Sequence, residues 1–130
     1  MIKKITTTFI LFIFSTQVFA QDLKSSMRLM SRNLRAVSGF VRKGDNSSKA
    51  LEKIIELKQA TSDALKYLPK GIDPSDSVAV DRYTSLIEQV LKKIDELEAT
   101  FLTSPLDKAQ AKLALDEINS LRKQGHSIFK

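Results

Sequence analysis

The sequence predicts an all-α protein, an up-down-up-down antiparallel four-helix bundle that follows a cleaved signal peptide. Apolar residues recur at spacings of three and four in four successive segments, which is the period of a helix with one buried face. Breaks that contain proline or glycine separate these segments, and no strand-like alternation competes with the helical period. Because the breaks are short, consecutive helices should run antiparallel.

The first twenty residues predict an export signal and not a part of the fold. Two lysines near the start are followed by an apolar stretch over residues 5–14 and by Val18-Phe19-Ala20, which has the small-residue pattern of a cleavage site. The stretch is shorter than the roughly 20 residues of a bilayer-spanning helix, so a retained anchor is the weaker interpretation. We expect residues 1–20 to be removed, and residues 21–130 to form one small domain without a stable membrane anchor.

The composition excludes several kinds of site. The sequence contains no cysteine, so the exported domain has neither disulfides nor thiolate ligands for zinc or iron–sulfur centres. A Cys-x-x-Cys-His motif is also absent, so any haem would be held without covalent bonds. With 42% hydrophobic residues and no tryptophan, the core should be mostly aliphatic, as in a helical bundle.

The first two helices are predicted from their ends and their apolar stripes. Asp22 should cap the first helix, residues 44–46 should end it, and Asn46 or Ser47 should cap the second. Two prolines and a glycine in residues 69–74 should stop the second helix. The first stripe comprises Leu23, Met27, Met30, Leu34, Val37 and Val41, and the second comprises Leu51, Ile54, Leu57 or Lys58, Thr61, Leu65 and Leu68.

The third helix should begin near Asp76 or Ser77. A break at residues 103–105 should precede the fourth helix, with Ser104 as its N-cap, a proline at the first helical position and Asp107 in the first turn. The fourth helix should then run almost to residue 130. The third stripe comprises Val80, Tyr83, Ile87, Val90 or Leu91, Ile94, Leu97 and Phe101.

His126 is the only histidine in the 130 residues, and Met27 is its natural partner. In an antiparallel bundle with an even number of helices, the start of the first helix and the end of the last meet at one pole. A thioether and an imidazole facing each other there suit the two axial positions of a haem iron. Plain packing is the alternative, because histidine also complements a helix C-terminus and methionine often fills cores.

The predicted surroundings of this pair favour a flat apolar ligand. Arg122 lies one turn before His126 and Lys130 one turn after it, so both share its face and suit carboxylates on a haem edge. Ordinary solvated charges are the alternative for these two side chains. The residues expected to wrap the ring are Leu23, Met30, Tyr83, Ile87 and Phe129.

These residues resemble the soluble cytochrome b562 family. Asp22-Leu23-x-x-x-Met27, followed by an Asn-Leu pair, is similar to the first-helix pattern of that family, and Arg122-x-x-x-His126-x-x-x-Lys130 is similar to its Arg-x-x-x-His-x-x-x-Arg. The resemblance covers essentially all of residues 21–130. It implies one non-covalent haem b, with Met27 and His126 as iron ligands and Arg122 near the porphyrin edge.

Two departures from the family pattern lie close to the histidine. Gly125 stands where relatives usually have an aromatic residue, and glycine weakens a helix by about 0.5–1 kcal/mol relative to alanine. Lys130 stands where the family has arginine, which replaces a planar fork by a mobile point charge. Both departures bear on how tightly haem is held.

The resemblance implies a periplasmic b-type cytochrome that transfers one electron and has no enzymatic turnover of its own. The competing interpretation is a haem-free helical-bundle protein of the periplasm, such as a small chaperone or a stress-related binding protein. A divalent metal site is a weaker alternative, because the single histidine has no paired carboxylate motif.

Charge indicates the kind of partner. The formal net charge of +6 becomes +4 once the two lysines of the signal are removed, and the first helix is the basic part. A basic face suits an unidentified redox partner with an acidic surface, or an anionic membrane, and a merely solvated face is the alternative. We expect no nucleic-acid partner and a monomer. The basic residues are Lys24, Arg28, Arg32, Arg35, Arg42 and Lys43.

Overall fold

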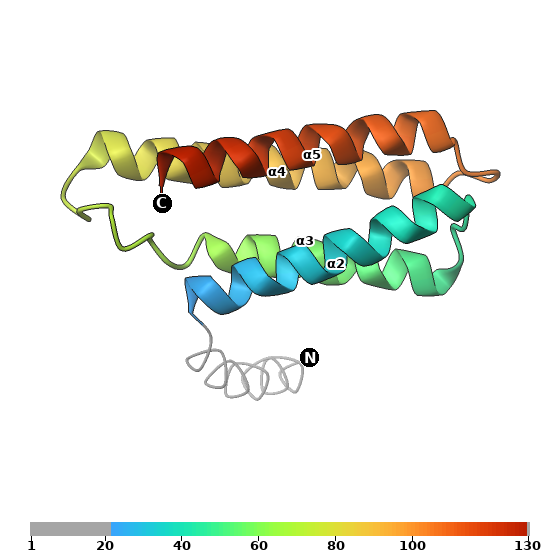
Figure 1. Ribbon diagram of the computed structural model, residues 1–130, viewed down its shortest axis with the longest axis horizontal. Coiled ribbons are helices and arrows are strands. Elements are labelled where there is room, and N and C mark those ends of the chain that lie inside the picture. The colour runs from blue at the N-terminus through green and yellow to red at the C-terminus, as the bar shows by residue number, and fades with distance from the viewer. Residues whose placement is uncertain (1–21, 130) are drawn as a thin grey trace, which may run out of the picture.

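The computed structural model describes residues 22–129 and contains four helices in this range. They are α2 (Leu23–Lys43), α3 (Ser48–Ala64), α4 (Ser77–Phe101) and α5 (Lys108–Ile128). The helices form an antiparallel bundle in which α4 and α5 lie together in the upper half of Figure 1 and α2 and α3 in the lower half. The predicted all-α four-helix bundle is therefore confirmed. The predicted signal peptide, residues 1–20, lies outside the described residues.

The buried core runs along the inner faces of the four helices. Packing joins α2 to α3, α3 to α4, α4 to α5 and α5 to α2, and the α2–α5 seam is the most open of the four. No helix within residues 22–129 is long and apolar enough to cross a membrane. The large side chains with the least exposure are Val37, Ile54, Leu57, Ile94, Leu97 and Ile118.

Three of the four predicted helix starts are confirmed by side chains that cap them. Asp22 accepts a hydrogen bond from the Ser25 N–H (2.8 Å), and Ser47 and Asp76 are the N-caps of α3 and α4. Hydrogen bonds to the Asp22 carboxylate, chiefly from the Ser25 N–H, lower its pKa. Gly44 ends α2 with a φ of 67°, a left-handed conformation that glycine adopts without strain.

The predicted start of the fourth helix is wrong by three residues. Ser104 does not cap α5, and Pro105 lies before the helix. The N-cap is Asp107, whose Oδ1 accepts a hydrogen bond from the Gln110 N–H (3.1 Å). The Ser-Pro pair matched a helix-start pattern, but Asp107 offers the same cap closer to the first helical turn, and Leu106 is buried between the two positions.

Replacing Asp107 by alanine is therefore expected to destabilise the protein, whereas Ser104→Ala should not. Loss of an N-cap typically costs about 0.5–2 kcal/mol of the free energy of unfolding, because a helical N–H loses its acceptor. Urea unfolding followed by circular dichroism measures both variants. Equal effects of the two substitutions would contradict the assignment of the cap.

The second helix ends earlier than predicted. It stops at Ala64, so Leu65 and Leu68 lie in the connection over residues 65–76 and not on the helix, and this connection is longer than the other two. Leu57 faces the core, whereas Lys58 forms ion pairs with Asp95 and Glu98 on α4 (2.8 and 3.2 Å). Leu57 and not Lys58 therefore belongs to the apolar stripe of the second helix, a choice that the periodicity left open. In α4, Val90 is buried and Leu91 is only partly buried.

Candidate functional site

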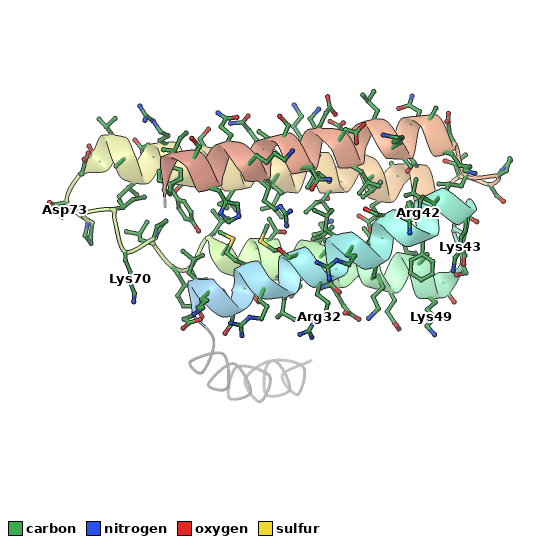
Figure 2. The ribbon with its side chains drawn as sticks, viewed as in Figure 1. Arg32, Arg42, Lys43, Lys49, Lys70 and Asp73 are labelled. Carbon is green, nitrogen blue, oxygen red and sulfur yellow. The ribbon has the colours of Figure 1, made fainter. Side chains whose placement is uncertain are left out.

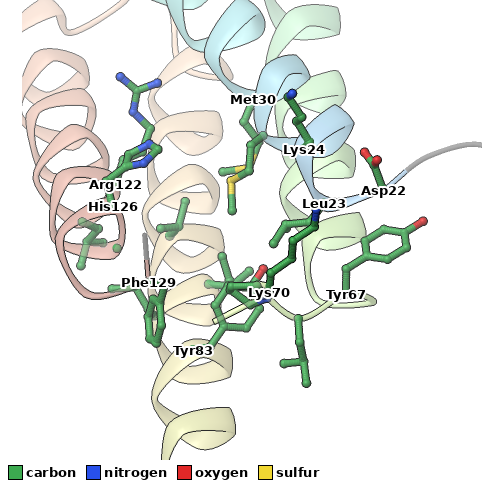
Figure 3. A pocket seen from close by; sticks show the side chains of 18 residues that line it. Asp22, Leu23, Lys24, Met30, Tyr67, Lys70, Tyr83, Arg122, His126 and Phe129 are labelled. Carbon is green, nitrogen blue, oxygen red and sulfur yellow. The ribbon is translucent and has the colours of Figure 1, made fainter. Parts of the chain in front are cut away.

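A cavity of about 710 Å³ opens at the pole where α2 begins and α5 ends. In Figure 3, Leu23 and Met30 reach it from α2, Tyr83 from α4, and His126 and Phe129 from α5. The volume lies within the range of roughly 300–1,000 Å³ that small-molecule and cofactor sites occupy. The lining residues are mostly apolar, which suits a flat hydrophobic ligand.

The structure brings all three predicted site residues to this cavity. Met27 lies on α2 and is partly buried, His126 lies near the end of α5 and is exposed, and Arg122 lies one turn earlier on α5 and is partly buried. Each of them lines the cavity. The Met27 sulfur and the His126 imidazole therefore come from two neighbouring helices, α2 and α5, whose seam is the most open in the bundle.

A hydrogen bond fixes the register between these two helices. The Arg122 Nη1 donates to the Ser31 Oγ across the seam at 2.7 Å. Because α2 and α5 are antiparallel, moving one turn back along α2 and one turn forward along α5 leads to the next facing pair. That pair is Met27 and His126. The register of the seam thus puts the two proposed ligands at the same level, at the pole where the sequence predicts them to meet.

The five residues expected to wrap a flat ring all line the cavity: Leu23, Met30, Tyr83, Ile87 and Phe129. Tyr83 and Phe129 form an edge-to-face pair with ring centroids 5.5 Å apart. The Tyr83 hydroxyl donates to the Ala64 carbonyl (2.8 Å), and burial raises its pKa to about 12. This hydrogen bond ties α4 to the end of α3 and holds the aromatic wall of the cavity in place.

Arg122 is not an ordinary solvated charge. Its Nε is buried and has no hydrogen-bond partner among the described residues, while its Nη1 is bonded to Ser31. A buried guanidinium N–H without an acceptor is costly, so a ligand that supplied an oxygen here would be stabilised. In Figure 3 the Arg122 side chain extends away from Tyr83 and Phe129. Lys130, the second predicted basic neighbour of His126, lies outside the described residues.

Sequence reasoning missed part of the cavity wall. Leu86 and Leu121 line it, and so does the start of the α3–α4 connection, residues 67–70. The signal for this connection was present, because a Tyr-Leu-Pro run is unusually apolar for a loop, and Pro69 is in fact buried. The position of this connection next to the start of α2 follows from the end of α3 at Ala64, which the sequence analysis placed too late.

The cavity contains a second sulfur donor. Met30 lines it as well as Met27, and Met30 is the more deeply buried of the two. The register of the α2–α5 seam favours Met27, because Met27 and not Met30 shares the level of His126. No group of three or more histidine, cysteine or acidic side chains within residues 22–129 is arranged to hold a metal ion. One thioether and one imidazole supply two donors, which suits a metal already held by a macrocycle.

Gly125 leaves room for the end of the Leu86 side chain, which reaches it from α4. A Cβ at this position would lie 2.8 Å from the Leu86 Cδ2, closer than real contacts allow. Leu86 lines the cavity, so a side chain at position 125 would push Leu86 into the space available to a ligand. The glycine that departs from the family pattern is thus matched to a leucine on the facing helix.

Gly125→Ala is expected to lower haem affinity about fivefold, at the low end of the roughly 1–3 kcal/mol that overpacking costs, because the displaced atom is the flexible end of the Leu86 side chain. The haem-free protein should not be destabilised to the same extent, because alanine favours the helix by about 0.5–1 kcal/mol. Haem titrations of Gly125→Ala, Leu86→Ala and the double variant test this coupling. Restored affinity in the double variant is expected, and unchanged affinity in Gly125→Ala would refute it.

A large apolar cavity in an antiparallel bundle, with a thioether and an imidazole on facing helices, is typical of helical-bundle cytochromes. The comparison with protein families agrees with this class. The chain belongs to the cytochrome b562 family, whose sequence model matches residues 22–130. The cofactor of this family is a non-covalent b-type haem with iron, and its members are haem-binding cytochromes that carry electrons. Neither a curated protein nor a solved structure gave a match.

Proposed function

We propose that the mature protein is a periplasmic b-type cytochrome that binds one haem through Met27 and His126 and transfers single electrons. The observation that carries the proposal is the Arg122–Ser31 hydrogen bond across the α2–α5 seam, with the facing pair of Met27 and His126 one turn closer to the pole. The apolar cavity that both side chains line supports it.

The donor types favour electron transfer over catalysis. Met27 and His126 would hold the iron from the two sides of the cavity, which would leave no open position for oxygen or a substrate, and a methionine ligand would raise the reduction potential. When bound, haem supplies a one-electron Fe(III)/Fe(II) couple. The bundle keeps Met27 and His126 on two packed helices, so little rearrangement should accompany a change of oxidation state. We therefore expect no catalytic turnover.

The other side chains of the cavity would bind and shield the cofactor. Arg122 offers its buried Nε to a carboxylate on the cofactor edge, an interaction in which a guanidinium forms strong charge-assisted hydrogen bonds. Tyr83 and Phe129 present an aromatic wall, and the leucines, isoleucine and valine of α2, α4 and α5 exclude water. We expect the export signal in residues 1–20 to deliver the chain to the periplasm.

A haem titration of residues 21–130 tests the proposal. We expect saturation at one haem per chain and, on reduction, the sharp visible bands of a six-coordinate low-spin iron. The haem-free alternative, a periplasmic chaperone or stress-related binding protein, predicts no saturable uptake. Saturable uptake with a high-spin spectrum would support haem binding but would refute ligation of the iron by both Met27 and His126.

A further inference from the structure

The exposed side of α2 carries a single stripe of positive charge, which we call the α2 basic face. At 100° per residue its members fall within an arc of about 100°, and they extend over about 28 Å of helix. All are exposed. In Figure 2, Arg32 points outward from α2, and Arg42 and Lys43 lie at its far end. The α2 basic face consists of Lys24, Arg28, Arg32, Arg35, Arg42 and Lys43.

Only the two ends of this face have a carboxylate near them, Asp22 beside Lys24 and Asp45 beside Lys43, and its four arginines form no ion pair among the described residues. Helix α2 contains six basic and no acidic residues, whereas α3 contains three of each and α4 contains three basic and five acidic residues. Lysines of α3, α4 and α5 form ion pairs, for example Lys93 with Glu117 (3.3 Å) and Lys112 with Asp116 (3.0 Å). No side chain of the α2 basic face forms an ion pair with another residue of 22–129.

The α2 basic face is continuous with the rim of the cavity. Lys24 lines the cavity itself, and so does Lys70 on the α3–α4 connection, which projects from the same side of the bundle as Arg32 (Figure 2). Arg35 lines a small polar groove of about 210 Å³ in the α2–α5 seam together with Arg122, which also lines the cavity. A partner on this face would therefore lie next to the site of electron exchange.

We propose that the α2 basic face is the docking surface for an electron-transfer protein whose own surface is acidic. The proposal rests on the proposed function. Four of the six side chains are arginines, whose planar guanidinium groups match carboxylates in bidentate pairs. Complementary charge speeds encounter and orients the partner more than it adds affinity, as suits a transient electron-transfer complex.

The apolar residues of the surface favour a protein partner over a membrane. A helix that lies in a membrane interface buries an apolar face beside its basic one. Helix α2 has no exposed large apolar side chain, because its apolar face is directed into the bundle. The exposed large apolar residues among the described ones lie elsewhere: Ile55, Leu65, Val78, Leu102, Leu113 and Ile128.

A charge-reversal experiment tests the proposal with plant-type [2Fe–2S] ferredoxin as an acidic probe. Arg28→Glu/Arg32→Glu reverses two exposed charges of α2 that do not line the cavity. The matched control, Arg82→Glu/Lys92→Glu, makes the same change of net charge on exposed positions of α4, which does not pack against α2. Stopped-flow spectroscopy follows reduction of the haem-loaded variants by the reduced ferredoxin at several ionic strengths.

At low ionic strength the α2 pair is expected to slow reduction about tenfold and to flatten the dependence on salt, while the control stays within about twofold of the parent. Equal slowing by both pairs would refute the proposal, because net charge alone would then explain the effect. So would binding to phosphatidylglycerol vesicles that depends on the α2 pair. If the protein takes up no haem, the proposed function is refuted but the docking proposal is still open to test. Amide NMR of the haem-free protein with ferredoxin then shows whether the partner contacts α2.

Discussion

Replacing His126 by alanine is expected to abolish the low-spin spectrum of the haem-loaded protein and to weaken haem binding severely. The imidazole is the only histidine donor in the chain, so no other residue of its type can take over. Loss of an outer-shell partner of a metal ligand already costs roughly 10–100-fold in affinity, and loss of the ligand itself should cost more. Haem titration with visible spectroscopy measures both effects.

Because His126 is exposed, His126→Ala should affect haem binding without affecting folding. Substitutions at exposed positions usually change the free energy of unfolding by no more than about 0.5 kcal/mol, so His126→Ala should fold like the parent when haem is absent. Lys123→Ala, at an exposed position one turn earlier on α5, is the matched control and should bind haem normally. An unchanged low-spin spectrum in His126→Ala would remove His126 from the ligand set.

The second large effect is expected at alkaline pH and comes from Tyr83. Its pKa is about 12 in the folded protein, against an ordinary value of 10.0, because burial disfavours the phenolate. The unfolded chain therefore loses the proton first. The stabilisation from the neutral phenol is fully present below pH 10 and is lost as the pH rises to about 12, by about 2–3 kcal/mol in total.

Tyr83→Phe isolates this contribution from the lysines and the other tyrosine, which titrate in the same range and remain in the variant. At neutral pH the variant should be less stable by about 1 kcal/mol, because the Ala64 carbonyl loses the phenol donor. Between pH 10 and 12 its stability should fall less steeply than that of the parent. Urea unfolding of the haem-free proteins at each pH measures the difference, and parallel profiles would contradict the buried-phenol account.

The fold could be predicted from local patterns because each helix carries its own signals. Asp22 caps the start of α2 and Gly44 caps its end, and each acts on backbone groups within one turn. The apolar stripes on α2 and α4 repeat with the helical period. Failure occurred where two residues offered similar local chemistry, as Ser104 and Asp107 did at the start of α5. The early end of α3 at Ala64 was also missed, because residues after it remain apolar up to Pro69.

The candidate site was predictable to the extent that it depends on topology. An even number of antiparallel helices brings Met27 and His126 to one pole, and the sequence alone indicated this. The contacts that define the cavity depend on tertiary packing, which no local pattern encodes. The Arg122–Ser31 hydrogen bond joins positions 91 residues apart, and the fit of Gly125 against Leu86 depends on the separation of two helices.

The central claim is that Met27 and His126 hold the iron, and methionine methyl NMR of the reduced haem-loaded protein tests it most directly. Residues 21–130 contain two methionines, Met27 and Met30. Selective labelling gives one methyl signal for each, and Met30→Leu assigns them. We predict that the Met27 methyl is shifted far upfield by the porphyrin ring current and that Met30 is shifted only moderately. A far upfield signal from Met30, or from neither residue, would contradict the account.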